Sequence, residues 1–343
     1  MTSLTRKKHY AEKIVFVDGL PGCGKTLFSQ LIASFDRVEL LSYVLEVEHM
    51  CSLHYLDKIP LDAAASLIRL QTDLKIYNTM MGRDVNFRST DLSSATNDYN
   101  PSRYTDRLSG PGDKKVPQII KKQRPILNLA VHNLLGYSEP IWEAVGPRCN
   151  FIEVIRHPLY MIRQQALNFD SLIGSPRDFT VYYSFQDREL PYYVKEWEDI
   201  FINQNSFERS ISFINNYNRR VSFLKKGILK KQLSKILTIP FELFVLNPQP
   251  WIEKIEAIIE IKASSDTRKV MLSQKIPRKK VADGVDLEIY RRCGWEPPKI
   301  GASERDELNI RREEVVMNIK PKMVSVLDKI CSDYEKKYWL PDE

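Results

Sequence analysis

Five scattered cysteines, no long apolar run and no basic tract set the first limits on this chain. The cysteines are odd in number and no two form a Cys-x-x-Cys pair, so neither a disulfide framework nor a zinc ribbon is indicated. They are Cys23, Cys51, Cys149, Cys293 and Cys331. No run of 18 apolar residues occurs, the N-terminus has no hydrophobic h-region, and no basic tract is interleaved with aromatic residues. These absences predict a protein of the reducing cytoplasm, with no membrane span and no nucleic acid as a partner.

The composition is that of an ordinary globular protein. Of 343 residues, 43% are hydrophobic and 28% are charged, and no internal repeat or low-complexity tract occurs. This length suits one large α/β domain over residues 1–343. The net charge of +7 suits a polyanionic ligand, but spread over 51 basic and 44 acidic residues it is also ordinary variation among proteins.

A phosphate-binding loop is the strongest motif. A short apolar strand beginning at Lys13 leads into Gly-x-x-x-x-Gly-Lys-Thr, and an amphipathic helix follows. The loop residues are Gly19, Leu20, Pro21, Gly22, Cys23, Gly24, Lys25 and Thr26. Backbone N–H groups at a helix N-terminus bind phosphate or sulfate groups, and here the glycines form the turn while Lys25 adds a positive charge. The motif therefore predicts a nucleotide-like phosphate ligand.

Strands alternate with helices along the rest of the chain. Apolar runs predict further strands over residues 37–43, 125–131, 150–155 and 236–242. Helical patterns cover residues 61–81, 251–261 and 303–338, the last as one or two closing helices. This order predicts a single α/β domain with a three-layer parallel sheet of the P-loop nucleotide-binding type and helical insertions.

Two segments interrupt the alternation. Residues 82–122 are rich in Ser, Asn, Asp, Pro and Gly, which is typical of a lid or substrate loop or of a disordered segment. Residues 176–225 carry many aromatics among charges and are predicted to be helical. Together with the residues up to 235 they form a predicted acceptor-side region, and an aromatic helical core is the alternative interpretation.

A second candidate site follows the strand at 150–155. This strand delivers Arg156 to its carboxyl end, where ligands of open α/β sheets bind, and Pro158 then begins a helix. A guanidinium at this place can hold a phosphate through two hydrogen bonds. A kinase-like P-loop protein is expected to carry a Mg²⁺-binding carboxylate at such a strand end, and here the residue is arginine.

With these two motifs the chain resembles the sulfotransferase family, which uses 3′-phosphoadenosine 5′-phosphosulfate. The family pairs a Gly-Leu-Pro-x-x-Gly-Thr-Thr-Leu-like loop with a later strand ending in Arg-x-Pro. This chain has Gly-Leu-Pro-Gly-Cys-Gly-Lys-Thr-Leu at 19–27 and Arg156-His-Pro158. The resemblance implies that the loop holds the 5′-phosphosulfate and that Arg156 holds the 3′-phosphate of this donor, without a required metal. It also implies transfer of a sulfuryl group to a hydroxyl or amine by in-line attack.

The resemblance extends to three further positions. The family's phosphate-binding serine falls on Gln164, whose amide can still donate a hydrogen bond. The family's catalytic histidine corresponds to His132, which would accept the proton of the attacking hydroxyl as a general base; capping a strand is the alternative role. The family's loop lysine falls on Gly22, and Lys25 would instead stabilise the departing sulfuryl group.

A basic segment late in the chain covers the 3′-phosphate in the family. Arg278-Lys279-Lys280 and Arg291-Arg292 are the two candidates here, and neither reproduces the family's Arg-Lys-Gly pattern. His157 is expected to have a structural role. The acceptor, whether carbohydrate, lipid, peptide or metabolite, stays open.

Two other functions remain alternatives. Gly24-Lys25-Thr26 suits an ATP- and Mg²⁺-dependent kinase, which would need carboxylates from Asp18, Asp84 or Asp91. A nucleotide-binding regulator without chemistry is the third possibility. Histidines and glutamates at 46–54 suggest a metal site only weakly, because two such residues on one helical face are common.

Overall fold

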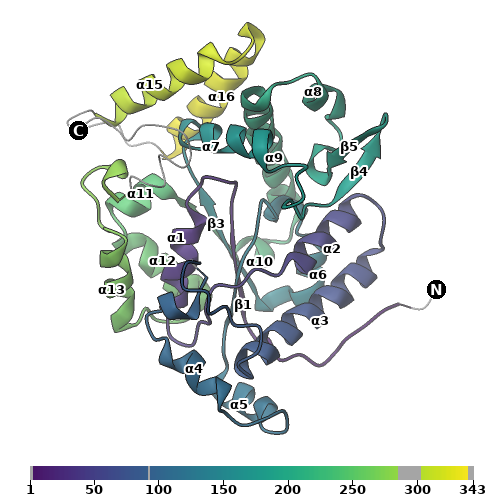
Figure 1. The fold of residues 1–343 in the computed structure, drawn as a ribbon, viewed down its shortest axis with the longest axis vertical. Coiled ribbons are helices and arrows are strands. Elements are labelled where there is room, and N and C mark those ends of the chain that lie inside the picture. The colour runs from purple at the N-terminus through teal and green to yellow at the C-terminus, as the bar shows by residue number, and fades with distance from the viewer. Residues whose placement is uncertain (1–2, 92, 285–302, 339–343) are drawn as a thin grey trace.

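A four-stranded parallel sheet forms the centre of the molecule (Figure 1). The structure is a computed structural model and describes residues 3–91, 93–284 and 303–338. The strands, in their order across the sheet, are β2 (Leu127–Ala130), β1 (Ile14–Asp18), β3 (Cys149–Ile155) and β6 (Ile236–Pro240). All three pairings are parallel, so the carboxyl ends of the strands meet at one edge. The predicted parallel α/β fold is confirmed.

Helices connect the strands and cover the sheet. Between β1 and β3 they are α1 (Lys25–Ala33), α2 (Leu45–Tyr55), α3 (Leu61–Met80), α4 (Ser102–Leu108), α5 (Val116–Gln123) and α6 (Glu139–Val145). After β3 they are α7 (Pro158–Ser171), α8 (Glu198–Ile202), α9 (Ser206–Gly227), α10 (Lys230–Leu233), α11 (Phe241–Leu246), α12 (Gln249–Ile259), α13 (Ser265–Ser273), α15 (Glu304–Met317) and α16 (Pro321–Tyr338). The helices predicted at 61–81, 251–261 and 303–338 are therefore confirmed. Within the described residues, no helix combines the length and the apolar character that a membrane span needs.

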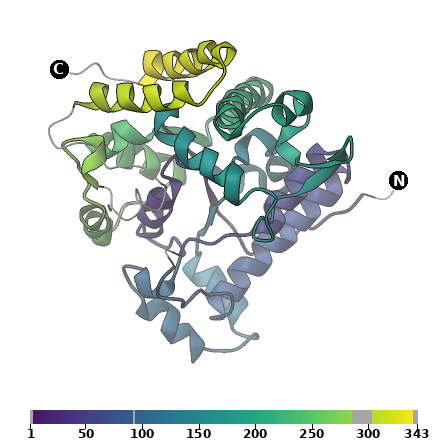
Figure 2. The same ribbon diagram turned by 45° about the horizontal axis from the view of Figure 1, so that its top comes forward.

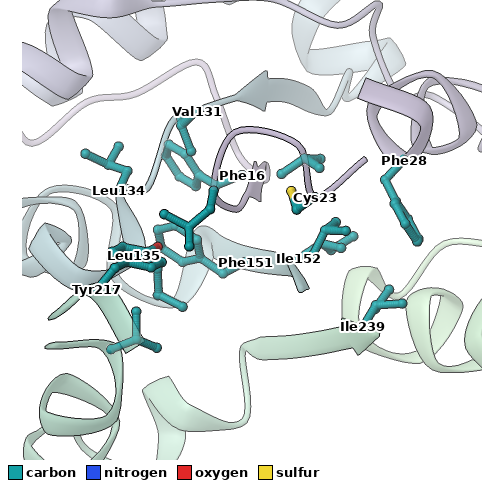
Figure 3. Packing of buried hydrophobic residues seen from close by; sticks show 14 of the residues in the cluster. Phe16, Cys23, Phe28, Val131, Leu134, Leu135, Phe151, Ile152, Tyr217 and Ile239 are labelled. Carbon is teal, nitrogen blue, oxygen red and sulfur yellow. The ribbon is translucent and has the colours of Figure 1, made fainter. Parts of the chain in front are cut away.

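The core lies on both faces of the sheet, which explains why β1 and β2 are buried along their whole length. On one face Phe16 stacks on Phe151, with ring centroids 5.0 Å apart (Figure 3), and Trp142 of α6 contacts Phe151. On the other face Phe28 of α1 packs against Phe244 of α11, with centroids 4.4 Å apart. Strands buried on two faces read as continuous apolar runs, so the sequence pattern could locate them.

The strand predicted at 37–43 is not formed as a regular strand, and that prediction is wrong. The segment touches the sheet edge at two isolated parallel bridges, Val38 with Ile126 and Ser42 with Leu129. Arg37 has a φ of 61°, outside the extended region, although four backbone hydrogen bonds still join the segment to residues 126–130. Tyr104 of the insertion accepts a hydrogen bond from the Leu40 N–H at 2.6 Å.

The insertion at 82–122 contains the short helices α4 and α5 in an otherwise irregular path. It is fastened to the edge segment by Arg107, whose guanidinium donates to both carboxylate oxygens of Glu39 at 2.8 and 2.9 Å. In Figures 1 and 2, α4 and α5 lie at the end of the molecule opposite the yellow helices α15 and α16. Whether the insertion acts as a lid stays a prediction.

The region at 176–235 is helical only in part, which corrects the prediction. A β-hairpin of β4 (Tyr182–Phe185) and β5 (Arg188–Pro191) precedes the long helix α9. Aromatic residues favour strands, and Gln186 and Asp187 form the two-residue turn with φ values of 47° and 59°. Neither turn residue is glycine, so the sequence carried no strong hairpin signal.

Candidate nucleotide-binding site

The phosphate loop connects β1 to α1 at the carboxyl edge of the sheet. Gly22 and Gly24 have φ values of 87° and 92°, which residues with a Cβ rarely adopt. A Cβ on Gly24 would lie 2.4 Å from the ring of Phe241, the first residue of α11. Within the described residues, the backbone N–H groups of Gly22 and Gly24 have no protein acceptor. The loop therefore forms a tight cradle with free donors, as a bound phosphate requires.

Lys25 begins α1 directly beneath this loop. Its side chain is buried, and its Nζ donates to the carbonyl of Gly19 at 3.1 Å. An ammonium has three donors, so further bonds to a phosphate or sulfate oxygen remain available. Cys23 lies buried in the loop beside Gly19, and burial raises the pKa of its thiol. Lys25 and Cys23 therefore both lie against the backbone of the predicted loop.

Arg156 lies next to the phosphate loop, as its place after β3 predicted. Its Nη1 donates to the carbonyl of Gly22 at 3.1 Å. The guanidinium carbon lies 4.5 Å from the ring centroid of Phe241 and 4.8 Å from that of Tyr160, a distance typical of cation–π contacts. The buried Nε of Arg156 makes no hydrogen bond within the described residues. The arginine is held in place by aromatic rings while part of its donor fork stays free.

Glu242 orients this arginine, and sequence reasoning missed it. Its carboxylate lies 3.9 Å from Arg156 Nε and accepts hydrogen bonds from the His157 backbone N–H at 3.0 Å and the Tyr334 hydroxyl at 2.5 Å. Phe241 and Glu242 follow β6 directly, so they lie at the same sheet edge as Arg156. Arg156 was singled out because it follows the carboxyl end of a strand, and the same rule applies to the residues after β6.

Two neighbouring residues on α7 have different roles. The predicted phosphate ligand Gln164 lies beside the loop, since a Cβ on Gly22 would be 3.2 Å from its Oε1. Gln165 is buried, and its Nε2 donates to the carbonyl of Pro21 at 3.1 Å. Gln165 therefore supports the loop backbone, while Gln164 stays a predicted ligand. His157 is buried, accepts a hydrogen bond from the Leu159 N–H and contacts Glu335, so its role is structural.

A cavity of about 1060 Å³ opens from the loop. Gly19, Leu20, Cys23 and Arg156 are among its lining residues, whereas Gly22, Gly24 and Lys25 are not. Side chains of α9 and α16 line much of the rest. Described residues of the 82–122 insertion do not contribute to its wall. The cavity is large enough for a nucleotide together with a second ligand.

His132 lies two residues beyond β2 and outside the cavity wall. Its Nδ1 lies 3.0 Å from Oε1 of Glu48 on α2, and its ring stacks on Tyr43 with centroids 6.0 Å apart. The following residue, Asn133, donates its backbone N–H to the carbonyl of Gly19 at 3.4 Å, so this segment runs beside the phosphate loop. The Glu48 contact fixes one ring nitrogen, and Nε2 has no hydrogen-bond partner among the residues that the structure describes. No sequence pattern connects these two residues.

The carboxylates near the loop are occupied by protein contacts. Asp18 is fully buried and accepts hydrogen bonds from the backbone N–H groups of Leu134 and Leu135, at 3.0 and 2.6 Å, and from the Tyr217 hydroxyl at 2.8 Å. Desolvation raises the pKa of Asp18 against these hydrogen bonds. Glu153 is bound by Lys225 and Thr238. Both carboxylates therefore have structural partners.

The other carboxylates and histidines considered above have partners elsewhere. Asp84 accepts from Asn78, and Asp91 from Asn86, all in or beside the insertion. His49 contacts the carbonyl of Phe179. No group of three potential metal ligands occurs among the residues that the structure describes.

Of the two basic segments, one can be placed. The Arg278 guanidinium lies 5.6 Å from the ring centroid of Phe241, the same ring that supports Arg156, and Nη1 donates to the Val281 carbonyl at 2.8 Å. Arg291 and Arg292 lie outside the described residues.

The solved structures that this chain resembles include sulfotransferases, the family predicted from the two motifs. The sulfotransferase domain of the Synechococcus PCC 7002 olefin synthase is 11% identical, with a TM-score of 0.46 over 99% of this chain and 100% of that one. The corresponding domain of the curacin biosynthetic pathway is 10% identical, with a TM-score of 0.47 over 96% and 99%. Mouse sulfotransferase SULT7A1, complexed with PAP, is 10% identical, with a TM-score of 0.37 over 95% and 85%.

No protein-family model and no curated protein sequence matches this chain. The structural similarities are distant, with TM-scores below 0.5, so the activities of those proteins are not transferred to this one.

Replacing Gly24 by alanine is expected to disrupt the phosphate loop. The left-handed backbone costs about 1–2 kcal/mol for a residue with a Cβ, and the new methyl group would displace the Phe241 ring that supports Arg156. We expect at least a tenfold loss of nucleotide affinity by calorimetry. Gly227→Ala, at a site with open space, is the matched control and should bind normally. A G24A protein with unchanged affinity would contradict the cradle described here.

Proposed function

We propose that this protein is a sulfotransferase that moves a sulfuryl group from 3′-phosphoadenosine 5′-phosphosulfate to a hydroxyl or amine acceptor. The observation that carries the proposal is the position of Arg156, whose Nη1 lies 3.1 Å from the carbonyl oxygen of Gly22 in the phosphate loop. Two separate anion-binding elements, the loop and this arginine, suit a nucleotide with phosphate groups at both its 5′ and 3′ positions.

The residues at the site fit such a nucleotide. The loop offers the unpaired N–H groups of Gly22 and Gly24, and Lys25 adds an ammonium beneath them. Arg156 donates to the loop through Nη1, and its Nη2 has no hydrogen bond in the described part of the chain, so Nη2 can donate to an anionic ligand. Gln164 lies close enough to the loop to contribute its amide.

Each residue then has a distinct task. The donor nucleotide supplies an activated sulfuryl group when bound. The loop N–H groups and Lys25 orient the 5′ end and stabilise the negative charge that develops at the bridging oxygen. Arg156 holds the 3′ end, and Glu242 holds Arg156. His132 accepts the proton of the acceptor hydroxyl at Nε2, while Glu48 holds Nδ1.

An ATP- and Mg²⁺-dependent kinase is the second candidate, favoured by the Gly24-Lys25-Thr26 sequence. Thr26 would be one Mg²⁺ ligand, and a carboxylate would have to supply another. Asp18 already accepts three protein hydrogen bonds, and Asp84 and Asp91 are engaged in or beside the insertion. The arginine at the end of β3 and the engaged carboxylates favour the sulfotransferase.

Calorimetric titration separates the two functions. We expect adenosine 3′,5′-bisphosphate to bind tightly with or without Mg²⁺, and ADP with Mg²⁺ to bind at least tenfold more weakly. A preference for ADP with Mg²⁺ would overturn the proposal in favour of the kinase. Equal, weak binding of both nucleotides would contradict the two-anion site itself.

A further inference from the structure

The end of α9 and the short helix α10 form a surface rich in lysine. Residues 219–235 contain two arginines and five lysines but no aspartate or glutamate. Lys225 pairs with the buried Glu153, and Lys235 lies 3.6 Å from Glu260. Within the described residues these are the only ion pairs of the segment, so much of its positive charge is not neutralised by a neighbouring carboxylate.

Three lysines of this segment are exposed and unpaired. The side chains of Lys226, Lys230 and Lys231 make no hydrogen bond or ion pair within the part of the chain that the structure describes. Only three residues separate Lys226 from Lys230, so the three ammonium groups are neighbours on one surface. Together they give this surface a local excess of positive charge.

Large apolar side chains are exposed among these lysines. Phe223 is 80% exposed, Leu229 58% and Leu233 41%. Single exposed apolar residues are ordinary, but three of them within a short segment that also holds unpaired lysines form a patch. The patch, which we call the α10 patch, consists of Phe223, Lys226, Leu229, Lys230, Lys231 and Leu233.

The α10 patch extends from the rim of the cavity to the amino edge of the sheet. Phe223 and Lys226 line the cavity, and the other four members do not. The Lys235 carbonyl, just after α10, accepts a hydrogen bond from the Phe151 N–H near the beginning of β3. The phosphate loop lies at the opposite, carboxyl edge. The side chains of α10 can therefore be changed without touching the candidate nucleotide site.

The chemistry of the α10 patch is that of a surface that binds an anionic membrane. Anionic lipid headgroups attract clustered lysines, and leucine and phenylalanine side chains insert at the boundary between headgroups and acyl chains. A second copy of the chain would place like charges opposite each other. Single-stranded nucleic acids bind on successive aromatic platforms, whereas Phe223 is the one aromatic ring of the patch. Charge complementarity and the exposed leucines together favour the membrane.

We propose that the α10 patch binds the surface of membranes that contain anionic lipids. Its unpaired lysines contact the negative groups of the lipid heads, and Phe223, Leu229 and Leu233 insert between the headgroups. Such binding is peripheral and reversible, since the patch lies at the interface and does not cross the bilayer. It does not depend on the proposed sulfotransferase function.

Co-sedimentation of the full chain with vesicles tests the proposal. We expect the protein to sediment with vesicles of phosphatidylcholine and phosphatidylserine in a ratio of about 3:1, and not with vesicles of phosphatidylcholine alone. Added salt should weaken binding, because its ions screen the lysines from the lipid headgroups. Equal binding to both kinds of vesicle, or binding to neither, would overturn the proposal.

Two double variants of the patch separate charge from insertion. Lys230→Gln with Lys231→Gln should weaken binding to the anionic vesicles at least tenfold. Leu229→Ser with Leu233→Gln should weaken it at least threefold and leave its salt dependence in place. Leu229 is the N-cap of α10, a position where serine is favoured, so the helix should persist, and thermal unfolding checks this. Unchanged binding by either folded double variant would contradict the proposed contact.

The matched control is Lys121→Gln with Lys122→Gln on α5. These lysines are also an exposed pair, but no large apolar residue of α5 is exposed beside them. This variant should bind the anionic vesicles normally, and equal losses in both lysine variants would overturn the assignment to the α10 patch. A labelled single-stranded oligonucleotide and an acidic peptide, followed by anisotropy, test the other partners. Binding of either one that depends on the α10 lysines as strongly as vesicle binding does would overturn the membrane as the partner.

Calorimetry with adenosine 3′,5′-bisphosphate separates this proposal from the proposed function. The four side chains substituted on the α10 patch lie outside the cavity, so both double variants should keep their nucleotide affinity. Vesicle binding without nucleotide binding would support the α10 patch and contradict the sulfotransferase. Nucleotide binding without vesicle binding would contradict the α10 patch and leave the sulfotransferase standing.

Discussion

Arg156→Gln is expected to weaken binding of adenosine 3′,5′-bisphosphate by about 100-fold. A hydrogen bond to a charged group contributes about 1.5–3 kcal/mol, and 1.4 kcal/mol corresponds to a factor of ten in affinity. Losing a two-bond contact to the 3′-phosphate therefore costs about two orders of magnitude. ADP has no 3′-phosphate, so its affinity should fall less than tenfold. Calorimetric titration of both nucleotides against both proteins measures the difference.

The control for this prediction is Arg163→Gln. Arg163 lies on the same helix, α7, but its Nη1 pairs with Glu314 at 3.0 Å and it does not line the cavity. Arg156→Lys keeps the positive charge beside Glu242 while removing the planar fork, so it separates charge from geometry. Thermal unfolding of each variant shows whether the protein stays folded. Equal losses for both nucleotides in the folded Arg156→Gln protein would contradict the assigned 3′-phosphate contact.

The central sheet could be predicted from the sequence because most of its strand residues are buried. Such strands appear as mainly apolar runs, and β1, β2, β3 and β6 all lie where such runs occur. The hairpin at 182–191 escaped prediction for the opposite reason. Only β4 is aromatic, neither strand is buried along its whole length, and the turn consists of Gln186 and Asp187 without glycine. Local pattern therefore identified the core and missed the surface.

Some residues of the candidate site could likewise be identified from the sequence, and others could not. Gly24, Lys25 and Arg156 could be found because each directly follows a predicted strand or forms part of a local motif. Glu242 and Glu48 could not be found, because each acts through a residue far along the chain. Glu242 contacts Arg156, 86 positions away, and Glu48 contacts His132, 84 positions away. Long-range contacts of this kind arise only when the fold brings the strand ends together. The residues that orient the site therefore came from the structure.

Tertiary contacts also change the role assigned to Asp18. By sequence it directly precedes the phosphate loop and qualifies as a Mg²⁺ ligand. In the structure its carboxylate faces Leu134, Leu135 and Tyr217, which hold η2 (Leu135–Tyr137) and α9 to the end of β1. Removing a buried acceptor of three hydrogen bonds leaves its donors unpaired. Asp18 therefore stabilises the fold around the site, and a substitution of Asp18 is expected to lower the stability of the protein whatever its effect on catalysis.

His132→Ala is expected to lower kcat at least 100-fold while leaving the affinity for adenosine 3′,5′-bisphosphate within about twofold. General base catalysis contributes about 10²–10⁴ in rate, and neither the loop nor Arg156 contacts this histidine. The side chain is 42% exposed, so imidazole added to the buffer can reach the space that the ring leaves. Partial recovery of kcat by imidazole distinguishes a lost base from a damaged structure. Steady-state assays with and without imidazole, using any acceptor that supports turnover, make the measurement.

His49→Ala is the matched control, since His49 lies on α2 near Glu48 and its ring contacts the Phe179 carbonyl and no other polar group among the described residues. It should keep full turnover and show no response to imidazole. Glu48→Gln should lower kcat by about tenfold, because the amide can still contact Nδ1 but holds the ring orientation less strongly. Full turnover in His132→Ala would remove this histidine from the mechanism. The carboxylates of the cavity wall, Glu153, Glu196 and Asp333, would then be the candidates for the base.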